Sequence, residues 1–425
     1  MGAANSKQQS LINKRQKVND YSNPKVQITS EHLMRKTYPL FAVRQIANAY
    51  AARAKAACPP ECNPTMPLLY ALARSWAWGA VAYRCQTHPQ EAEAVDEKGD
   101  TTLHWACFGN CPAATVELIL QANPSQATLV NIKGELPLHL ACSYRASAET
   151  IRVVLEANPA AANEFTLAGS NPLHLLADYG GSAEAMWHIL RASSTAATVC
   201  DHLYQRRPME ILNGRKNMHE FSSVRETLRS VRRKQKLLRE DSIEWSDLEV
   251  GIEEYRTSEF WQKIALLAVA ESRFDDALLQ MQPIDLVSHP VVLMACVSNA
   301  LCPPSIQEFA ILLYSHQLMV PYDGNLALHE AVKAGSFHAL QDLLFYAPDA
   351  SQVRSEEAKL PLTYLLERED ATWLDGVGYL MQAYPPALQD TALPVAYYPI
   401  LWSRFPPDVL YASIRCSPDL LHNFE

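Results

Sequence analysis

The sequence predicts an all-α protein built from stacked helix-turn-helix units, and two observations carry this prediction. A Leu-His phrase recurs every 35 residues, at His104, His139 and His174, each time five residues after a glycine and at the start of an apolar run. A second apolar segment follows each phrase, and in two units it stops at Asn-Pro. A fixed period between about 20 and 50 residues is typical of repeat proteins, whose units bury their apolar faces only against their neighbours.

The first helix of each unit is expected to be short and to begin at a proline. The glycine before it supplies a turn with positive φ, which glycine adopts without strain. Thr or Asn then caps the helix, and Pro suits the first position because the N–H that it lacks has no helical partner there. Residues 137–143 are the clearest example, and we expect Leu138 to lie in the core.

The second helix follows within the same unit, as residues 147–157 illustrate. Its apolar residues Ile151, Val154 and Leu155 are spaced to lie on one helical face. The pair 158–159, Asn-Pro, is expected to end this helix, because the residue before a proline is driven out of the α region. An Asn-Pro pair ends the corresponding segment of the preceding unit in the same way.

These phrases resemble the ankyrin repeat, whose signature is T-P-L-H-x-A between a glycine turn and a pair of helices. The resemblance implies an ankyrin-repeat solenoid of about nine units, in which the repeat histidine bonds the backbone of the neighbouring turn. Several units lack the Thr or the His of the signature. The copies are anchored at Pro67, Thr102, Pro137, Pro172, Pro208, Pro290, Ala327, Pro361 and Pro394.

The spacing of the units also predicts the domain organisation. Successive anchors lie 33 to 37 residues apart, except between Pro208 and Pro290, where the interval is 82 residues. We therefore expect two repeat arrays separated by a charged helical insertion. The predicted segments are a flexible basic tail at 1–30, a helical N-cap at 31–65, ankyrin repeats at 66–213, the insertion at 214–257, and ankyrin repeats with a C-terminal cap at 258–425.

The insertion is expected to be basic first and acidic afterwards. Residues 205–239 carry eleven Lys or Arg and three Glu, whereas residues 240–259 carry eight acids and one Arg. A long basic helix of this kind binds calmodulin-like proteins or lipid, and the run 232–236 resembles a nuclear signal. Alternatively, the helix packs its apolar stripe on the repeats and the opposite charges neutralise each other, which is the interpretation we favour.

Two pairs of side chains raise the alternative of a metal site. His104 and Cys107 lie three residues apart, as do His139 and Cys142, so each pair shares one helical face. A structural zinc site needs four ligands, however, and stacked units hold such pairs in line. We therefore expect no metal and no other cofactor. The sequence also lacks the Gly-rich phosphate loop and the other motifs of catalytic sites, so we expect no enzymatic activity.

The composition is that of a folded soluble protein. Of the 425 residues, 48% are hydrophobic and 20% are charged, and the net charge of −9 argues against nucleic acid as a partner of the whole chain. Ten cysteines without dense spacing suit a reducing compartment. The uncharged run 286–307 is long enough to span a membrane, but its prolines and polar residues argue against this. We expect a cytoplasmic location.

The N-terminus matches the pattern for N-myristoylation. Gly2 is followed by small or neutral residues and then by Ser6 and Lys7. One acyl chain binds membranes only weakly, so a second attraction is needed. Residues 1–36 carry seven Lys or Arg and two acids, and this net charge of +5 is expected to attract an anionic membrane surface. The alternative is a basic tail in which Gly2 is unmodified.

These features predict a non-catalytic adaptor that binds other proteins or peptides. In ankyrin-like stacks, the turns and first helices line the concave side, and variable positions there choose the partner. Alternatively, the aromatic residues at these positions pack against the next unit. A lipidated membrane protein that recruits cargo, and a nuclear or nucleic-acid-associated regulator acting through the basic helix, are the other functions considered. The predicted partner-binding positions are Trp105, Phe108, Tyr144, Arg145, Asp178 and Tyr179.

Overall fold

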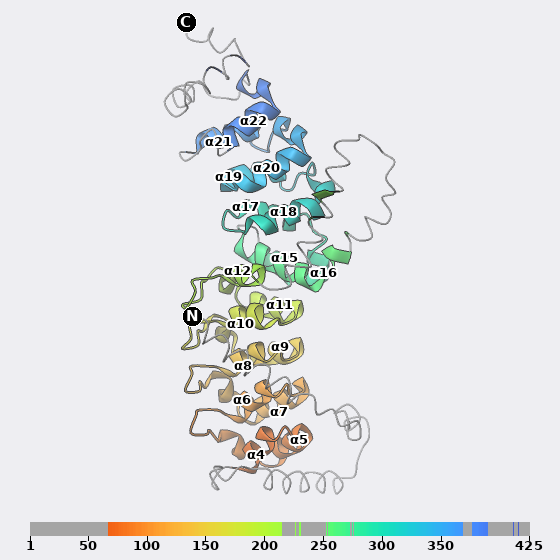
Figure 1. Cartoon of the computed structure of the whole chain (residues 1–425). Helices are drawn as coiled ribbons and strands as arrows, with labels where there is room; N and C mark the ends of the chain where they lie inside the picture. Colours follow the sequence, from red (N-terminus) through yellow and green to blue (C-terminus); the bar gives the residue numbers. More distant parts are fainter. Residues whose placement is uncertain are drawn as a thin grey trace.

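A row of short helices packed side by side makes up the structure (Figure 1). The computed structural model describes residues 67–214, 226, 229–230, 252, 254–272, 274, 276–368, 376–389, 411 and 415. Over these residues it contains helices and turns, with isolated bridges in place of β-strands. The expectation of an all-α fold is therefore confirmed.

One side of the row is formed by the first helix of each unit. Proline begins several of these helices, as predicted, and the Thr101 and Asn171 side chains cap two of them by accepting a backbone N–H. Consecutive members pack on one another on either side of the insertion. These helices are α4 (Leu68–Arg74), α6 (Thr102–Phe108), α8 (Pro137–Ser143), α10 (Pro172–Tyr179), α12 (Pro208–Asn213), α17 (Val291–Ser298), α19 (Ala327–Ala334) and α21 (Pro361–Glu367).

The other side is formed by the second helices. In the unit at 147–157, the Ser147 hydroxyl accepts the Thr150 N–H at 3.1 Å and caps the helix. The apolar residues predicted to share one face are all buried there. The second helices are α5 (Trp78–Thr87), α7 (Ala113–Ala122), α9 (Ala148–Ala157), α11 (Ala183–Ala192), α18 (Pro304–Leu313), α20 (Phe337–Tyr346) and α22 (Gly378–Ala383).

A 3-10 turn follows most of the second helices, and the Asn-Pro pairs lie at this junction. α9 ends at Ala157, Asn158 leaves the helical region with φ −147° and ψ 82°, and the turn η3 begins at Pro159. Proline therefore ends one helix, because it drives Asn158 out of the α region, and begins the next turn, because its fixed φ suits the first position of a helix. The turns are η1 (Pro89–Glu93), η2 (Pro124–Thr128), η3 (Pro159–Asn163), η4 (Ser194–Ala197), η7 (Pro348–Gln352) and η9 (Pro385–Gln389).

The described helices before and after the insertion belong to one row. α15 (Glu259–Glu271) packs against α11 and α12 on one side and against α17 on the other, and α16 (Pro283–Leu286) lies beside it. The Trp187 indole N–H also donates to the Leu279 carbonyl at 2.7 Å. The two predicted arrays, which the insertion separates in the sequence, therefore form one continuous row in space. Most of the insertion, the predicted tail and the predicted N-cap lie outside the described residues.

The core runs along the row between its two sides. Leu103, Leu138 and Leu173 occupy the same position in three successive units, and all are fully buried, so the expectation for Leu138 is confirmed. Six of the seven described cysteines are buried and all seven are free, so they pack as small apolar side chains. Among the described helices, none combines the length and the apolarity that a bilayer crossing requires.

Candidate interaction surface

In four of the first helices, a buried histidine ties the helix to the segment that carries the next turn. His139 accepts the Leu136 N–H at Nδ1, at 3.0 Å, and its Nε2 lies 2.9 Å from the Glu164 carbonyl. These partners place the ring proton on Nε2, because a carbonyl oxygen can only accept a hydrogen bond and a backbone N–H can only donate one. The predicted bond to the neighbouring turn is therefore confirmed. The same arrangement recurs at His104, His174 and His329.

These bonds decide between the two interpretations of the histidines. Both ring nitrogens of His104 and His139 are used, so neither side chain has a lone pair left for a metal ion. Burial lowers the pKa of both rings and holds that of His329 at about 4. Burial also raises the pKa of Cys107, the neighbour of His104 on α6, so its thiol is not a ready ligand. The histidines therefore have a structural role.

Successive turns are joined through their backbones. The Ile132 N–H donates to the Lys98 carbonyl of the preceding turn at 2.8 Å. The Leu167 N–H donates in the same way to the Lys133 carbonyl at 3.0 Å, and a third such bond comes from the His202 N–H. Between residues 98 and 202, the turns consequently form a continuous edge that holds these units in register.

Two glycines make this close spacing of the turns possible. Gly134 has φ +68°, and a Cβ added there would lie 2.9 Å from Leu167 Cγ and 3.0 Å from its backbone nitrogen. Gly169 has φ +79°, and its added Cβ would lie 2.3 Å from His202 Cβ. Each glycine therefore permits its own turn and also the approach of the following one.

Large apolar side chains project from these turns into solvent. Ile132 is 65% exposed, Leu167 79%, Leu203 67% and Tyr204 64%. A single exposed leucine is ordinary, whereas apolar side chains repeated at neighbouring turns make these turns a candidate interaction surface. We call these four residues the turn-tip row.

The sequence analysis did not select the turn-tip row, although a signal for it was present. Ile132 and Leu167 are 35 residues apart, and each precedes a repeat glycine by two residues. The repeat period therefore places both at the same point of successive turns. A search for apolar residues at equivalent turn positions would have found them.

Three of the predicted binding residues come together on the first helices. The ring centroids of Phe108 and Tyr144 lie 4.4 Å apart, and those of Trp105 and Phe108 lie 5.6 Å apart. Trp76, which is 46% exposed, packs on Phe108, and Tyr70 packs on Trp105. We call these five residues the aromatic cluster. Its predicted members are partly buried, so the rings pack across α4, α6 and α8 and also reach the surface.

Hydrogen bonds hold Trp105 in one orientation. Its indole N–H donates to the Tyr70 hydroxyl at 2.8 Å, and that hydroxyl donates to Asp96 Oδ2 at 2.6 Å. Burial and the bond to Asp96 raise the pKa of Tyr70, so the phenol remains a proton donor. The Arg74 guanidinium lies over the indole ring, 5.7 Å from its centroid. The aromatic cluster is thus tied to the turn that carries Asp96.

The other three predicted residues lie at the ends of α8 and α10. Arg145 has φ +56° and donates its Nε–H to the Tyr179 carbonyl in the next unit. Arg145 and Asp178 are exposed, and Tyr179 is half-buried. The structure therefore brings Arg145 and Tyr179 together, and Arg145 follows Tyr144 of the aromatic cluster directly.

No protein-family model matches this chain, and no curated protein matches its sequence. The candidate surface consequently depends on the geometry of the described residues. The predicted lipidation site, Gly2, lies outside those residues.

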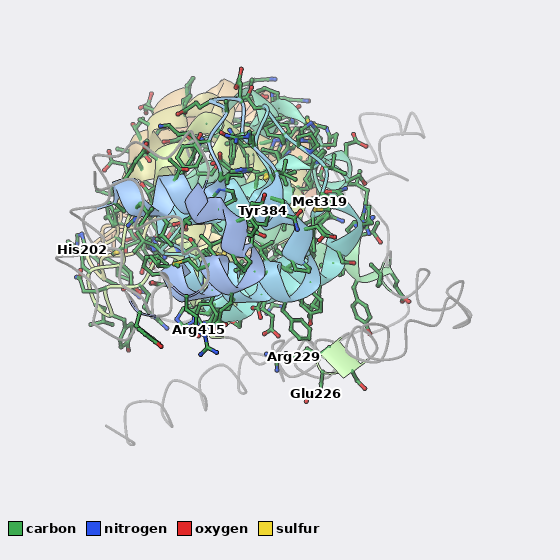
Figure 2. All side chains as sticks on the ribbon, turned by 90° about the horizontal axis from the view of Figure 1, so that it is seen from above. His202, Glu226, Arg229, Met319, Tyr384 and Arg415 are labelled. Carbon is green, nitrogen blue, oxygen red and sulfur yellow. The ribbon has the colours of Figure 1, made fainter. Side chains whose placement is uncertain are left out.

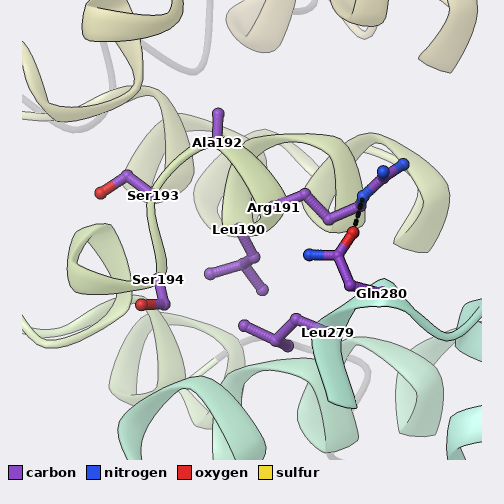
Figure 3. A pocket seen from close by; sticks show the side chains of 7 residues that line it. All are labelled: Leu190, Arg191, Ala192, Ser193, Ser194, Leu279 and Gln280. Carbon is purple, nitrogen blue, oxygen red and sulfur yellow. Dashed lines mark hydrogen bonds between the residues drawn. The ribbon is translucent and has the colours of Figure 1, made fainter. Parts of the chain in front are cut away.

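A shallow hollow of about 220 Å³ lies between α11 and η5 (Asp276–Gln280). Figure 3 shows Arg191 and Gln280 at its rim, where the Arg191 Nε–H donates to Gln280 Oε1 at 3.0 Å. The Arg191 guanidinium also lies 4.7 Å from the centroid of the Trp187 ring. These contacts fasten the helices on either side of the insertion to each other. The hollow is therefore a packing seam of the row.

Proposed function

We propose that this protein is a non-catalytic ankyrin-repeat adaptor that binds a protein or peptide partner along its turns and first helices. The turn-tip row is the observation that carries the proposal. Apolar side chains are normally buried, and here they are exposed on turns that backbone bonds hold at regular intervals. Such a row fits an extended partner that crosses several units.

The aromatic cluster supports the same proposal. Aromatic residues and arginine are the side chains most often found where truncation weakens binding strongly. Trp105 and Tyr70 are oriented by hydrogen bonds before any partner arrives, so little side-chain entropy remains to be lost on binding. The bond from Tyr70 to Asp96 connects this cluster with the first turn, and the backbone bond from Ile132 to Lys98 joins that turn to the next one, which carries Ile132.

The ankyrin assignment is part of the proposal and has its own support. Glycine turns with positive φ, short helices that begin at proline, and buried histidines that bond the next unit recur at the repeat period. In a stack of this kind, each unit contributes a turn and a helix end to a shared surface. A partner is then selected by residues from several units at once.

Site-specific photo-crosslinking in the full chain tests this surface. A photoreactive phenylalanine analogue replaces Leu167 or Ile132, and the control places it at Glu156, which is exposed on α9. In extracts of cells that make the protein, we expect one and the same protein to crosslink from positions 132 and 167 and to be absent from position 156. Equal crosslinking from all three positions would contradict the proposal.

Affinity measurements with the crosslinked protein complete the test. Leu167→Asp and Trp105→Ala are each expected to weaken its binding by about tenfold or more, which corresponds to about 1.4 kcal/mol. The thermal midpoint of Leu167→Asp should remain that of the wild type, because the side chain is exposed. Wild-type affinity in both variants would show that this side of the row does not bind the partner.

A further inference from the structure

Two residues at the ends of the insertion, Asn213 and Arg256, contact the same helix, α18. The Ser305 hydroxyl, at the start of α18, donates to Asn213 Oδ1 at 3.0 Å. At the other end of α18, Arg256 donates from Nη2 to the Leu313 carbonyl at 3.2 Å. Eight residues of helix separate the two contacts, about 12 Å along its axis. The intervening chain therefore begins and ends beside α18.

A third contact lies between these two. Arg229 forms an ion pair through Nε with Oε1 of Glu308, in the first half of α18. Glu308 is only 7% exposed, so this ion pair is shielded from water on the side of α18. The three contacts follow the same order along the insertion and along α18, since residues 213, 229 and 256 meet residues 305, 308 and 313.

Glu308 is one of two carboxylates at this place. Burial and the negative charge of Glu308 raise the pKa of Asp342 on α20 to about 6, while the charges of Arg229 and His338 act in the opposite direction. Two partly buried carboxylates on adjacent helices repel each other unless a cation compensates them. The guanidinium of Arg229 supplies that charge, and its several N–H groups suit carboxylate acceptors.

We infer that α18 and α20 form a docking site for this chain's own basic segment, residues 215–239, with Arg229 as its anchor and Glu308 as its acceptor. Charge complementarity supports this occupant, because the segment carries nine Lys or Arg and two Glu. Docking holds the segment against the protein and withholds its basic side chains from anionic partners. This docking within the chain goes beyond the proposed adaptor role.

This docking site is separate from the proposed partner surface. Figure 2, which looks down the row, shows the turn residue His202 on one side and Glu226 with Arg229 on another. α18 and α20 are second helices, whereas the turn-tip row and the aromatic cluster belong to the turns and first helices. A negative result for the docking site therefore does not contradict the proposed partner surface, and the reverse also holds.

A charge-reversal cycle on the full chain tests the docking. Trypsin cleaves after Lys and Arg, so its rate of cleavage between residues 232 and 236 in the native protein reports how often the segment is released. Arg229→Glu and Glu308→Arg are each expected to raise this rate about tenfold, as the loss of a charge-assisted bond predicts. The double variant, in which the charges are exchanged, is expected to be cleaved at nearly the wild-type rate.

Matched variants keep the test specific. Arg152→Glu makes the same change of charge on α9, where Arg152 pairs with Glu149 and Glu156, and should leave the cleavage rate unchanged. Glu308→Gln is measured as well, because arginine at a nearly buried position can unfold α18, and thermal midpoints identify any such unfolding. The docking site is disproved if Arg229→Glu and Glu308→Gln are cleaved at the wild-type rate, or if the exchanged pair is cleaved as fast as the single reversals.

Discussion

Arg207 and Glu271 form a buried ion pair at the junction where the row resumes after the insertion, with Nη1 and Oε2 2.7 Å apart. Asn299 also donates to Glu271 Oε2, at 2.9 Å, while Oε1 of the same carboxylate is buried without a hydrogen bond. Burial destabilises the charged form of the Glu271 carboxylate more than Arg207 stabilises it, so the Glu271 pKa rises to about 7. The junction therefore contains a group that titrates near neutral pH.

The Glu271 carboxyl is expected to make stability fall as pH rises. Its folded pKa lies above the unfolded value of 4.5, so the folded state binds the proton more tightly, and the benefit is lost as pH rises from about 4.5 to about 7. The loss is on the order of 3 kcal/mol, at about 1.4 kcal/mol for each pKa unit. Urea unfolding at a series of pH values should show the wild type losing stability relative to Glu271→Gln over this window. A difference that does not change with pH would contradict the assignment.

His139→Leu is expected to destabilise the protein by about 2 kcal/mol or more, because it leaves the Leu136 N–H and the Glu164 carbonyl without their partner. Burial lowers the pKa of His139 in the folded state. The unfolded chain therefore takes up the proton first as pH falls below about 6.5, and the wild type then loses its advantage over the variant. Chemical unfolding at pH 7.5 and pH 5 measures this gap, which should shrink at the lower pH. A cost below about 0.5 kcal/mol would mean that these bonds do not hold the units together.

Gly134→Ala is expected to cost about 1–3 kcal/mol, because alanine is strained at φ +68° and its Cβ would press on Leu167. Gly79→Ala is the matched control. Gly79 is an exposed residue within α5, where alanine is a better helix former by about 1 kcal/mol. Thermal unfolding should therefore move the two midpoints in opposite directions. A neutral Gly134→Ala would show that the turns tolerate wider spacing.

The stabilities of Leu138→Ala and Leu167→Ala are expected to distinguish a core residue from a residue of the turn-tip row. Leu138 is fully buried, and its truncation should cost about 2–5 kcal/mol, whereas Leu167 is exposed and should cost less than about 0.5 kcal/mol. Calorimetry of the two variants measures these costs. Similar losses in both variants would place Leu167 in the core and would remove it from the proposed binding surface.

Gly2→Ala tests the predicted lipidation, which concerns residues outside the described part of the chain. We expect a loss of membrane-bound protein on fractionation of eukaryotic cells, because the basic tail alone binds anionic lipid only weakly. Mass spectrometry of the N-terminal peptide provides an independent readout. An unmodified wild-type peptide, or the same distribution for both proteins, would exclude membrane recruitment through Gly2.

Much of the local structure follows from the sequence. The turns, the proline-started helices and the Asn-Pro ends depend on backbone preferences that act over a few residues, and the repeat period multiplies each signal. The resemblance to the ankyrin repeat implied the histidine bonds, and Leu138 was expected in the core; both expectations are confirmed. Of the predicted binding residues, Trp105, Phe108 and Tyr144 pack together in the structure, and their binding of a partner stays a prediction.

The sequence by itself determined the ends of the clearest helices, such as Pro137–Ser143 and Ala148–Ala157, because caps, prolines and apolar spacing are local properties. Only the tertiary structure decided which distant segments meet. Arg207 and Glu271 are 64 residues apart, Arg229 and Glu308 are 79 apart, and no repeat relates either pair. Arg207 meets Glu271 because α15, which carries Glu271, packs onto α12 and α17 and so joins the two arrays into one row. Burial at that junction, and not the identity of the side chain, moves the Glu271 pKa to about 7.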